Sequence, residues 1–399
     1  MKRTVLKHGA IYTPTEVIDD GYMILSDGGQ IEAIGRGDIP EPEQAELVDC
    51  SGKLIVPGLI DVHVHGGGGY AMHKATFADI DGMSRYHARF GTTAFLPTTA
   101  TTTTEAIIAS IRNAVNAAGR TTGAQIAGIH LEGPYLNSKR KGAIRAEHIR
   151  LPDPQELRQF VEAAAGYLRI VTLAPEIAGG MDGVRRLNGI GIAVSIGHSD
   201  ATYEQVRQAV QCGASQTTHH FNGMSPFHHR EPGVAGAGLL LPELTTELIC
   251  DGVHVHPGAV KLLFEMKTPE RVCLITDSVI CAGMPDGIYE DRFLVRDGIV
   301  SLVDGSSLAG SSLTMLQALK NAIRFTGYSL EKLLPSATAV PAKQAQLPNK
   351  GSLAKGKDAD FLILTPELDL QATYVLGTKV YEKGGAINKH NESGGHTNE

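Results

Sequence analysis

The sequence predicts an α/β protein built on a (β/α)₈ TIM-like barrel, with a small β domain contributed by both ends of the chain. Three observations lead to this fold class. Short apolar runs alternate with helical patterns through the middle of the chain, both flanks instead alternate apolar and polar residues, and polar side chains gather where the apolar runs end. A chain of 399 residues is long enough to bury the large core that such a barrel needs.

Both flanks are typical of short strands separated by turns. Residues 1–56 alternate apolar and polar residues in TVLKHGAIYT, GYMILSDGGQIEAIG and AELVDCSGKLIVPG, which break at Gly, Asp or Pro. Residues 346–385 have the same texture. We therefore expect one small β domain assembled from both flanks, followed by a polar, Gly-rich and flexible tail over residues 386–399.

The pattern of residues 57–345 predicts the barrel itself. Apolar runs without polar alternation are typical of parallel strands that are buried on both faces. Eight such runs occur: LIDVHVH (59–65), TAFLPTT (93–99), IAGIHLE (126–132), RIVTLAP (169–175), IAVSIGH (192–198), ASQTTHHF (214–221), TELICDG (246–252) and RVCLITD (271–277). Helical patterns such as TTEAIIASIRNAVNAAG and DPQELRQFVEAAAG lie between them. This alternation fits a closed barrel better than an open doubly wound sheet.

Composition excludes several classes of protein. The formal net charge of −7 argues against a nucleic-acid partner, because phosphate-binding surfaces concentrate Lys and Arg. The Cys residues form no CxxC pair, which predicts a reducing compartment and no disulfide scaffold. Because there is no signal-peptide pattern and no run of about 18 apolar residues, we expect a cytoplasmic protein without a membrane partner.

Polar side chains gather at the ends of the predicted strands, and histidine is prominent among them. In order along the chain they are Asp61, His63, His65, His130, Glu132, His198, His219, His220 and Asp277. The carboxyl ends of the strands form one face of a (β/α)₈ barrel, so these side chains are expected to converge. Residues two apart on a strand share a side, so His63 and His65 can both face the mouth of the barrel.

Imidazole nitrogens and carboxylates are the ligands of Zn²⁺ and other first-row divalent ions. The His, Glu and Asp residues at these strand ends would suffice for one metal or a close pair. Such a metal supports hydrolysis, since it lowers the pKa of a bound water and polarises a carbonyl. Asp277 is the natural proton shuttle, because it ends the last strand and is not part of a His cluster.

A plainer interpretation exists for each of these features. A lone His in an apolar strand is usually a hydrogen-bonded core residue. His130 and His220 neighbour the candidate ligands and either point away from the mouth or support the ligands from behind.

The loops 222–233 and 251–256 bring Gly amides, Arg230 and His254, which could hold an anion such as phosphate. The alternative for these two loops is an ordinary surface loop with exposed His.

Seven motifs carry a resemblance to a known family. They are PGLIDVHVHG (57–66), HLEGPYLN (130–137), GHSDATY (197–203), THHFNGMSPFHHREPG (218–233), DGVHVHPG (251–258), ITDS (275–278) and LAGSSLTM (308–315). In this order, over residues 50–360, they resemble the N-acetylglucosamine-6-phosphate deacetylase family of the amidohydrolase superfamily.

The resemblance implies a metal-dependent (β/α)₈ barrel beside a β-sandwich formed by both chain ends, and a homodimer whose active sites lie near the subunit interface. It implies a principal metal bound by Glu132, His198 and His219, with Asp277 as general base and then general acid. The substrate contacts that it implies are Ala143, Asn222, Gly223, Arg230, His254, Leu308, Ala309 and Gly310. Among these, Arg230 and the amides of Asn222 and Gly223 are expected at the phosphate.

Some members of the family replace the first HxH pair and use one metal. This chain keeps His63 and His65, so we predict a binuclear site in which Glu132 bridges the two ions. The donor set accepts Zn²⁺, Fe²⁺ and Mn²⁺ alike and does not select among them. Relatives of the dihydroorotase and hydantoinase type use a carbamylated Lys. No Lys ends a predicted strand here, which disfavours those ring-opening activities.

The implied reaction is hydrolysis of N-acetyl-D-glucosamine 6-phosphate to D-glucosamine 6-phosphate and acetate, in amino-sugar catabolism and cell-wall recycling. The alternative substrate is the galactosamine epimer, which differs in one hydroxyl orientation and which no residue here excludes. A remote alternative is a non-catalytic amidohydrolase-like scaffold, whose expected signature is loss of ligands or of the shuttle carboxylate. Both the ligands and that carboxylate are present in this sequence.

Overall fold

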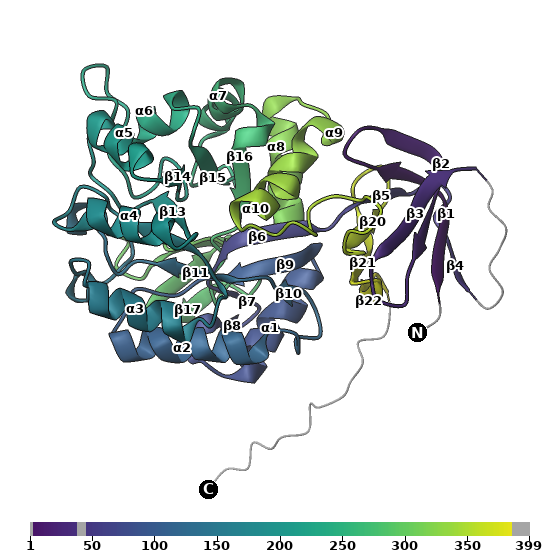
Figure 1. Cartoon of the computed structure of the whole chain (residues 1–399), viewed down its shortest axis with the longest axis horizontal. Helices are drawn as coiled ribbons and strands as arrows, with labels where there is room; N and C mark the ends of the chain where they lie inside the picture. The colour runs from purple at the N-terminus through teal and green to yellow at the C-terminus, as the bar shows by residue number, and fades with distance from the viewer. Residues whose placement is uncertain (1–2, 38–44, 385–399) are drawn as a thin grey trace, which may run out of the picture.

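The fold is known from a computed structural model, which describes residues 3–37 and 45–384. Figure 1 shows a β-sheet region that holds the first and the last strands of the chain, beside a larger region in which helices lie around parallel strands. The tail predicted over residues 386–399 lies outside the described residues. Within the described residues, no helix combines the length and the apolar character that a membrane crossing requires.

Strands from both ends of the chain share one eight-stranded sheet, in the order β22-β21-β20-β5-β1-β2-β3, with β4 paired to β1. Their bounds are β1 (Thr4–Tyr12), β2 (Val17–Leu25), β3 (Ile31–Arg36), β4 (Glu46–Asp49), β5 (Leu54–Pro57), β20 (Phe361–Leu364), β21 (Leu370–Val375) and β22 (Thr378–Glu382). The antiparallel pairing of β5 with β20 joins the two ends. Apolar side chains from these strands form a core of their own, in which Phe361 stacks on Tyr374. This core explains the apolar and polar alternation in both flanks.

The rest of the chain alternates parallel strands with helices. Parallel pairings give the strand orders β10-β9-β6 and β11-β12-β13-β14-β15-β16. Isolated parallel bridges, Thr98 with His130 and Val64 with Ser278, link these two sheets on either side. The predicted alternation of parallel strands and helices is therefore confirmed in the part of the chain that the structure describes.

Each long parallel strand is followed by a helix. The bounds are β6 (Leu59–Val64) and α1 (Phe77–Ala88), β9 (Thr92–Pro97) and α2 (Thr104–Ala117), β10 (Gln125–Ile126) with β11 (Ile129–Glu132) and α3 (Pro154–Ala163), β12 (Leu168–Leu173) and α4 (Gly180–Gly189), β13 (Ala193–Ile196) and α5 (Tyr203–Gln211), β14 (Ala214–Thr217) and α6 (Gly233–Leu240), β15 (Thr245–Ile249) and α7 (Pro257–Lys267), and β16 (Val272–Ile275) and α8 (Met315–Thr326). Two short strands, β7 (Gly66–Gly67) and β8 (Tyr70–Ala71), follow β6, and two helices, α9 (Leu330–Leu333) and α10 (Ala339–Gln344), follow α8. Strands β6, β9, β15 and β16 are buried along their whole length, as parallel strands covered on both faces should be.

Several helices begin where a short polar side chain accepts a backbone N–H. Thr76, Thr103 and Asp153 cap α1, α2 and α3 in this way. Helix α5 begins with a capping box formed by Thr202 and Gln205. These caps fix where each helix starts, and so they limit the length of the loops that connect the strand ends to the helices.

An antiparallel insertion between β16 and α8 was not predicted. It comprises β17 (Gly287–Tyr289), β18 (Phe293–Arg296) and β19 (Ile299–Leu302). Its strands are short, and its few apolar side chains join Val279 and Ile280 in a small separate core, so no long periodic run marks it. The insertion matters for the site because it brings Arg292 and Phe293 to the cavity described below.

A hydrogen-bonded ion pair holds the long loop between β11 and α3. Glu156 on α3 accepts hydrogen bonds from Arg150 (Nη2 to Oε1, 2.7 Å), from Tyr135 (2.9 Å) and from Thr104. Burial alone would raise the pKa of Glu156, but these hydrogen bonds, led by that of Arg150, hold the pKa below its usual value. The network thereby ties the start of α2, the loop after Glu132 and α3 together.

We expect Glu156→Gln to lower the free energy of unfolding by about 2–3 kcal/mol, because it removes a charged acceptor that three donors share. Urea unfolding followed by circular dichroism measures this loss. The difference from wild type should shrink as the pH falls through the lowered pKa of Glu156, because the wild-type carboxyl then loses its charge as well. Equal unfolding midpoints at neutral pH would contradict the stabilising role.

Candidate metal centre

Glu132 lies in the middle of a cluster of histidines at the carboxyl ends of the parallel strands. Its Oε1 lies 3.2 Å from Nε2 of His198 and 3.1 Å from Nε2 of His219, and these two nitrogens are 3.1 Å apart. Its Oε2 lies 3.3 Å from Nε2 of His65, and that nitrogen lies 3.3 Å from Oδ1 of Asp277. One carboxylate therefore contacts histidines on both sides of the cluster.

His63 completes the second set. Its Nε2 lies 3.5 Å from Oε1 of Glu132 and 3.7 Å from Oδ1 of Asp277. The side chain is fully buried, yet this nitrogen has no hydrogen-bond partner among the described residues. Among the described residues, three groups of side chains have ligand atoms close enough to hold a metal ion, and two of these groups meet at the cavity end of the cluster: Glu132, His198 and His219, and His63, His65 and Asp277.

The other ring nitrogen, Nδ1, contacts an oxygen outside the cluster in all four histidines, which are His63, His65, His198 and His219. Three contacts are to backbone carbonyl oxygens: Nδ1 of His198 to Arg140 (2.7 Å), of His219 to Asn222 (3.1 Å) and of His65 to Thr98 (3.2 Å). Nδ1 of His63 instead contacts Oε2 of Glu247 at 3.0 Å. Because each Nδ1 contacts an oxygen, the neutral form of each ring carries its proton on Nδ1 and turns the lone pair of Nε2 toward the cluster.

This donor set fits a divalent metal ion. In a tetrahedral site with bonds of about 2.1 Å, neighbouring ligand atoms lie roughly 3.4 Å apart. The ligand atoms of Glu132, His198 and His219 lie 3.1–3.2 Å apart, close to that spacing. Imidazole and carboxylate are also the donors that Zn²⁺, Fe²⁺ and Mn²⁺ accept.

The electrostatics of the cluster favour a cation. Burial alone would lower the pKa of His65, but the hydrogen bonds and charges of Asp277 and Glu132 raise it to about 9. Burial would likewise raise the pKa of Asp277, but the charge of His63 and the hydrogen bond of His65 lower it to about 2. Among the described residues, the ion-pair partners of Glu132 and Asp277 are all histidines. A divalent ion would replace the positive charge that these buried carboxylates otherwise draw from protonated histidines.

Three of the site residues have a left-handed backbone. The φ angle is +46° at His198, +31° at His219 and +49° at Asp277. This conformation costs a residue with a Cβ of order 1 kcal/mol or more, and it clusters at functional sites. Strands β13, β14 and β16 each end two residues before the site residue, so the predicted strand runs were too long at their carboxyl ends.

The cluster opens into a cavity of about 430 Å³. The predicted metal and substrate residues that line it are His65, Glu132, Ala143, His198, His219, Asn222, Gly223, His254, Asp277, Leu308, Ala309 and Gly310. His63 is fully buried and does not line the cavity. Arg230 is exposed and does not line it either, so one chain alone does not bring Arg230 to its own cavity.

The cavity also contains residues that the sequence did not single out. Arg145, His148 and Arg292 line it, and Nη2 of Arg292 donates to the backbone oxygen of Ala143 at 2.7 Å. Arg145 and His148 lie in the loop after β11, and Arg292 lies in the unpredicted insertion. None of them ends a strand or belongs to a quoted motif, so no signal in the sequence marked them.

The geometry decides between the two interpretations of His130 and His220. Neither lines the cavity. Both nitrogens of His130 are hydrogen-bonded, Nδ1 to the backbone oxygen of Val62 (2.9 Å) and Nε2 to Oγ1 of Thr172 (2.8 Å), and its ring packs on that of His63. Burial lowers the pKa of His130 to about 4 and that of His220 to about 3, so both rings are neutral. His130 supports His63 from behind, whereas His220 belongs to the core.

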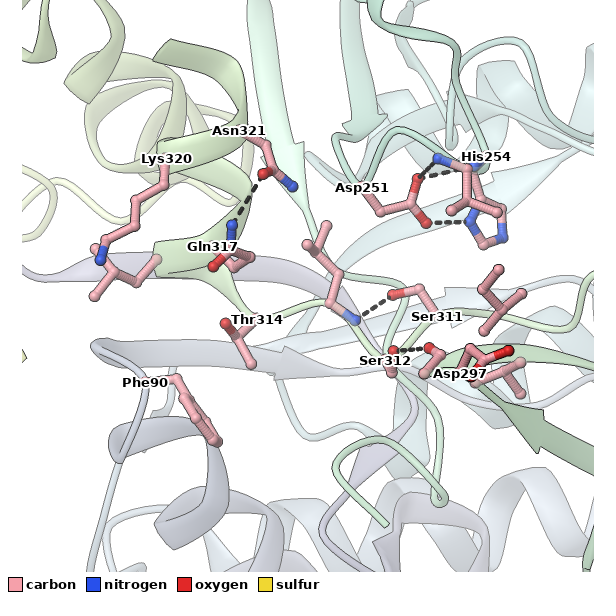
Figure 2. A pocket seen from close by; sticks show the side chains of 16 residues that line it. Phe90, Asp251, His254, Asp297, Ser311, Ser312, Thr314, Gln317, Lys320 and Asn321 are labelled. Carbon is pink, nitrogen blue, oxygen red and sulfur yellow. Dashed lines mark hydrogen bonds and ion pairs between the residues drawn. The ribbon is translucent and has the colours of Figure 1, made fainter. Parts of the chain in front are cut away.

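Asp251 holds His254 in place. Its Oδ2 accepts a hydrogen bond from Nδ1 of His254 at 2.6 Å, and its Oδ1 accepts from the backbone N–H groups of Val253 and His254, both at 2.8 Å. Figure 2 shows this pair at one end of a second cavity, of about 450 Å³, with Gln317 and Lys320 of α8 on the opposite side. His254 lines both cavities, and with Nδ1 engaged its Nε2 is the nitrogen left for a ligand.

Comparison with known proteins decides the family. The model of the amidohydrolase family matches residues 54–382. The chain belongs to the amidohydrolase family. The N-acetylglucosamine-6-phosphate deacetylase of Bacillus subtilis (strain 168) is 38% identical to this amidohydrolase, over 94% of this chain and 96% of its own length. The N-acetylgalactosamine-6-phosphate deacetylase of Escherichia coli O157:H7 is 36% identical, over 94% of this chain and 98% of its own length.

A solved structure is similar over the same extent. It is an aspartate-to-alanine mutant of the N-acetyl-D-glucosamine-6-phosphate deacetylase from Mycobacterium smegmatis, in complex with N-acetyl-D-glucosamine-6-phosphate. It superposes on this amidohydrolase with a TM-score of 0.89 at 31% identity, and the match covers 95% of this chain and all of the other. The family resemblance predicted from the seven motifs is confirmed.

Proposed function

We propose that this amidohydrolase hydrolyses N-acetyl-D-glucosamine 6-phosphate to D-glucosamine 6-phosphate and acetate, a reaction of amino-sugar catabolism and cell-wall recycling. The observation that carries the proposal is the pair of ligand groups that meet at Glu132, with Asp277 beside them, at one cavity of about 430 Å³. Similarity to the Bacillus subtilis deacetylase, and to the Mycobacterium smegmatis structure with this sugar phosphate, supports the choice of substrate.

The residues that would hold the metal form two sets that meet at Glu132. They are Glu132, His198 and His219 for a first ion, and His63, His65 and Asp277 for a second. When bound, the metal polarises the acetyl carbonyl and lowers the pKa of a water molecule. The donor set admits Zn²⁺, Fe²⁺ and Mn²⁺, so metal analysis of protein purified without chelator is needed to name the ion.

Asp277 moves the protons of the proposed reaction. It accepts a proton from the attacking water, whose oxygen adds to the acetyl carbon. It then donates that proton to the amide nitrogen as the C–N bond breaks, which releases acetate and the free amine. His254, held through Nδ1 by Asp251, presents its Nε2 as an acceptor to a sugar hydroxyl and so orients the ring.

The phosphate group has several candidate partners. The amides of Asn222 and Gly223 and the side chains of Arg145 and Arg292 lie at the cavity of the same chain. Arg230 is exposed outside this cavity, so it reaches a phosphate only if its loop moves or if a second copy of the chain presents it. The homodimer that the sequence motifs imply would allow the second route, and we propose this oligomeric state; sedimentation equilibrium tests it.

Substitution of the arginines separates these partners. We expect Arg230→Ala to raise KM for the phosphorylated sugar by about 10–100-fold, because a charged hydrogen bond to the phosphate is lost. KM for the unphosphorylated sugar should change much less. Arg292→Ala is the variant to compare with Arg230→Ala, because Arg292 lines the cavity of its own chain and Arg230 does not. Equal effects of Arg230→Ala on both sugars would show that Arg230 does not bind the phosphate.

The substrate itself is tested by the ratio of kcat/KM values for the two epimers of N-acetylhexosamine 6-phosphate. The proposal expects the larger value for the glucosamine epimer. Equal or reversed values would overturn this substrate and favour the galactosamine epimer, which the similarity to the Escherichia coli O157:H7 enzyme keeps as the alternative. A protein that folds, behaves the same with and without metal, and hydrolyses neither epimer would be a non-catalytic scaffold instead.

We also propose the finer division of the fold. The two parallel sheets and the bridges that link them support a closed (β/α)₈ barrel over residues 57–345. The sheet shared by both chain ends supports a β-sandwich over residues 1–56 and 346–385. The cytoplasmic location and the absence of a nucleic-acid partner stay predictions from composition.

A further inference from the structure

We propose that Glu247 is a positioning residue for the second metal of the proposed binuclear site. It fixes the tautomer and the orientation of His63, so that Nε2 of His63 is held as a metal ligand. Glu247 lies within β15, outside every motif quoted above, and its side chain does not line the cavity. This inference rests on the proposed function, because it needs a metal at His63, His65 and Asp277.

Glu247 connects two strand ends that carry site residues. Its Oε2 accepts a hydrogen bond from Nδ1 of His63 at 3.0 Å and another from the backbone N–H of His219 at 3.2 Å. The carboxylate therefore lies between β6, which holds His63, and the turn after β14, which holds His219. Both Glu247 and His63 have no exposed surface, so water does not compete for these hydrogen bonds.

Oε2 of Glu247 already accepts the backbone N–H of His219, so it is an acceptor toward His63 as well, and this decides the tautomer of His63. Nδ1 of His63 must carry the proton that it shares with Glu247, which leaves the lone pair on Nε2. In agreement, Nε2 of His63 is buried without a hydrogen-bond partner among the described residues and faces Glu132 and Asp277. Carboxylate partners of this kind also raise the basicity of a metal-bound imidazole.

His63 differs from the other three histidines in the partner of its Nδ1. His65, His198 and His219 use backbone carbonyl oxygens, which the fold itself provides. His63 uses a side chain, so its orientation depends on one residue that can be substituted. A change at Glu247 removes the oxygen that Nδ1 of His63 contacts, whereas the His219 ring keeps its own contact with a backbone carbonyl oxygen and loses only a backbone hydrogen bond. The inference therefore predicts a larger effect on the second metal than on the first.

Glu247 could instead be a metal ligand itself, because ligand atoms of His63, His130 and Glu247 also lie close together. The hydrogen bonds of His130 argue against this. Its two nitrogens are bonded to the backbone oxygen of Val62 and to Oγ1 of Thr172, so neither is available to a metal. Nδ1 of His63 is likewise occupied by Glu247. The arrangement therefore supports the metal site from behind and does not form a third one.

The test compares metal affinities of two near-isosteric variants. Glu247→Leu removes the acceptor, and we expect it to bind the second metal ion about 10–100-fold more weakly, with a smaller loss at the first ion, whose ligand His219 loses only a backbone hydrogen bond. Glu247→Gln keeps an acceptor oxygen but loses the charge, and we expect a smaller loss of at least ~3-fold. Competition with a chelator gives the affinities and the number of ions per chain, and the absorption of the Co²⁺-loaded protein reports the coordination of each site.

Two control variants make the outcomes distinct. Glu156→Gln removes a carboxylate whose hydrogen-bond partners are Thr104, Tyr135 and Arg150 and none of the proposed ligands, so it should bind both ions with wild-type affinity despite its lower stability. His63→Ala should lose the second ion outright.

If His63→Ala loses that ion while both Glu247 variants bind it as wild type does, the positioning role is wrong and the proposed function stands. If His63→Ala binds two ions normally, the second metal site is wrong, and this inference fails with it. If Glu247→Leu does not fold, wild-type affinity in Glu247→Gln alone overturns the role.

Discussion

Asp277→Asn is expected to lower kcat by at least ~10³-fold while the protein keeps its first metal ion. The substitution keeps the size of the side chain and one acceptor oxygen but removes its ability to accept and return a proton. The backbone tolerates it, because Asp277 has a φ of +49° and Asn is among the residues that adopt this conformation most readily. The first ion is retained because its three ligands, Glu132, His198 and His219, are unchanged. Single-turnover rates and metal content per chain are the two measurements.

The matched control for this prediction is Asp20→Asn. Asp20 also has a positive φ, of +50°, but it lies in β2 and its exposed side chain contacts His8. Asp20→Asn should leave kcat unchanged. That result would show that replacing Asp by Asn is harmless at such a backbone angle. Loss of the second metal from Asp277→Asn, with only a modest fall in rate, would instead make Asp277 chiefly a ligand.

The alternation of buried strands and helices was predictable because parallel strands covered on both faces must be apolar throughout. Strand ends were less predictable. The run ASQTTHHF at 214–221 has no feature that marks where pairing stops, yet β14 ends at Thr217, where the chain turns to place His219 in a left-handed conformation. The antiparallel insertion at 287–302 was missed because its short strands pack only on a small local core.

The residues that face the cavity from the strand ends were predictable for a topological reason: the carboxyl ends of parallel strands meet at one edge. Contacts that depend on the register between strands could not be predicted from the sequence. Glu247 lies inside an apolar run, and only the packing of β15 against its neighbours brings it to His63. Arg292 reaches the cavity through the insertion, and Arg230 lies outside the cavity although its motif is specific.

Glu132→Gln should remove both metal ions and lower kcat/KM on the order of 10⁴-fold, since metal-ion catalysis supplies several kcal/mol of transition-state stabilisation. Oε1 of Glu132 contacts the nitrogens of His198 and His219, and its Oε2 contacts that of His65. A neutral amide at this position offers one weaker donor oxygen and turns N–H groups toward imidazoles that should point lone pairs at a metal. One substitution therefore disrupts both ligand groups.

His65→Ala and Glu156→Gln are the comparisons for Glu132→Gln. His65 belongs to one ligand group only, so His65→Ala should lose one ion and keep the other. Glu156→Gln makes the same chemical change at a carboxylate that contacts no histidine, so it separates loss of stability from loss of metal. If Glu132→Gln keeps one ion as tightly as wild type does, Glu132 does not bridge the two groups. The two oxygens of its carboxylate would then serve a single ion, and His63, His65 and Asp277 would hold the remaining ion without Glu132.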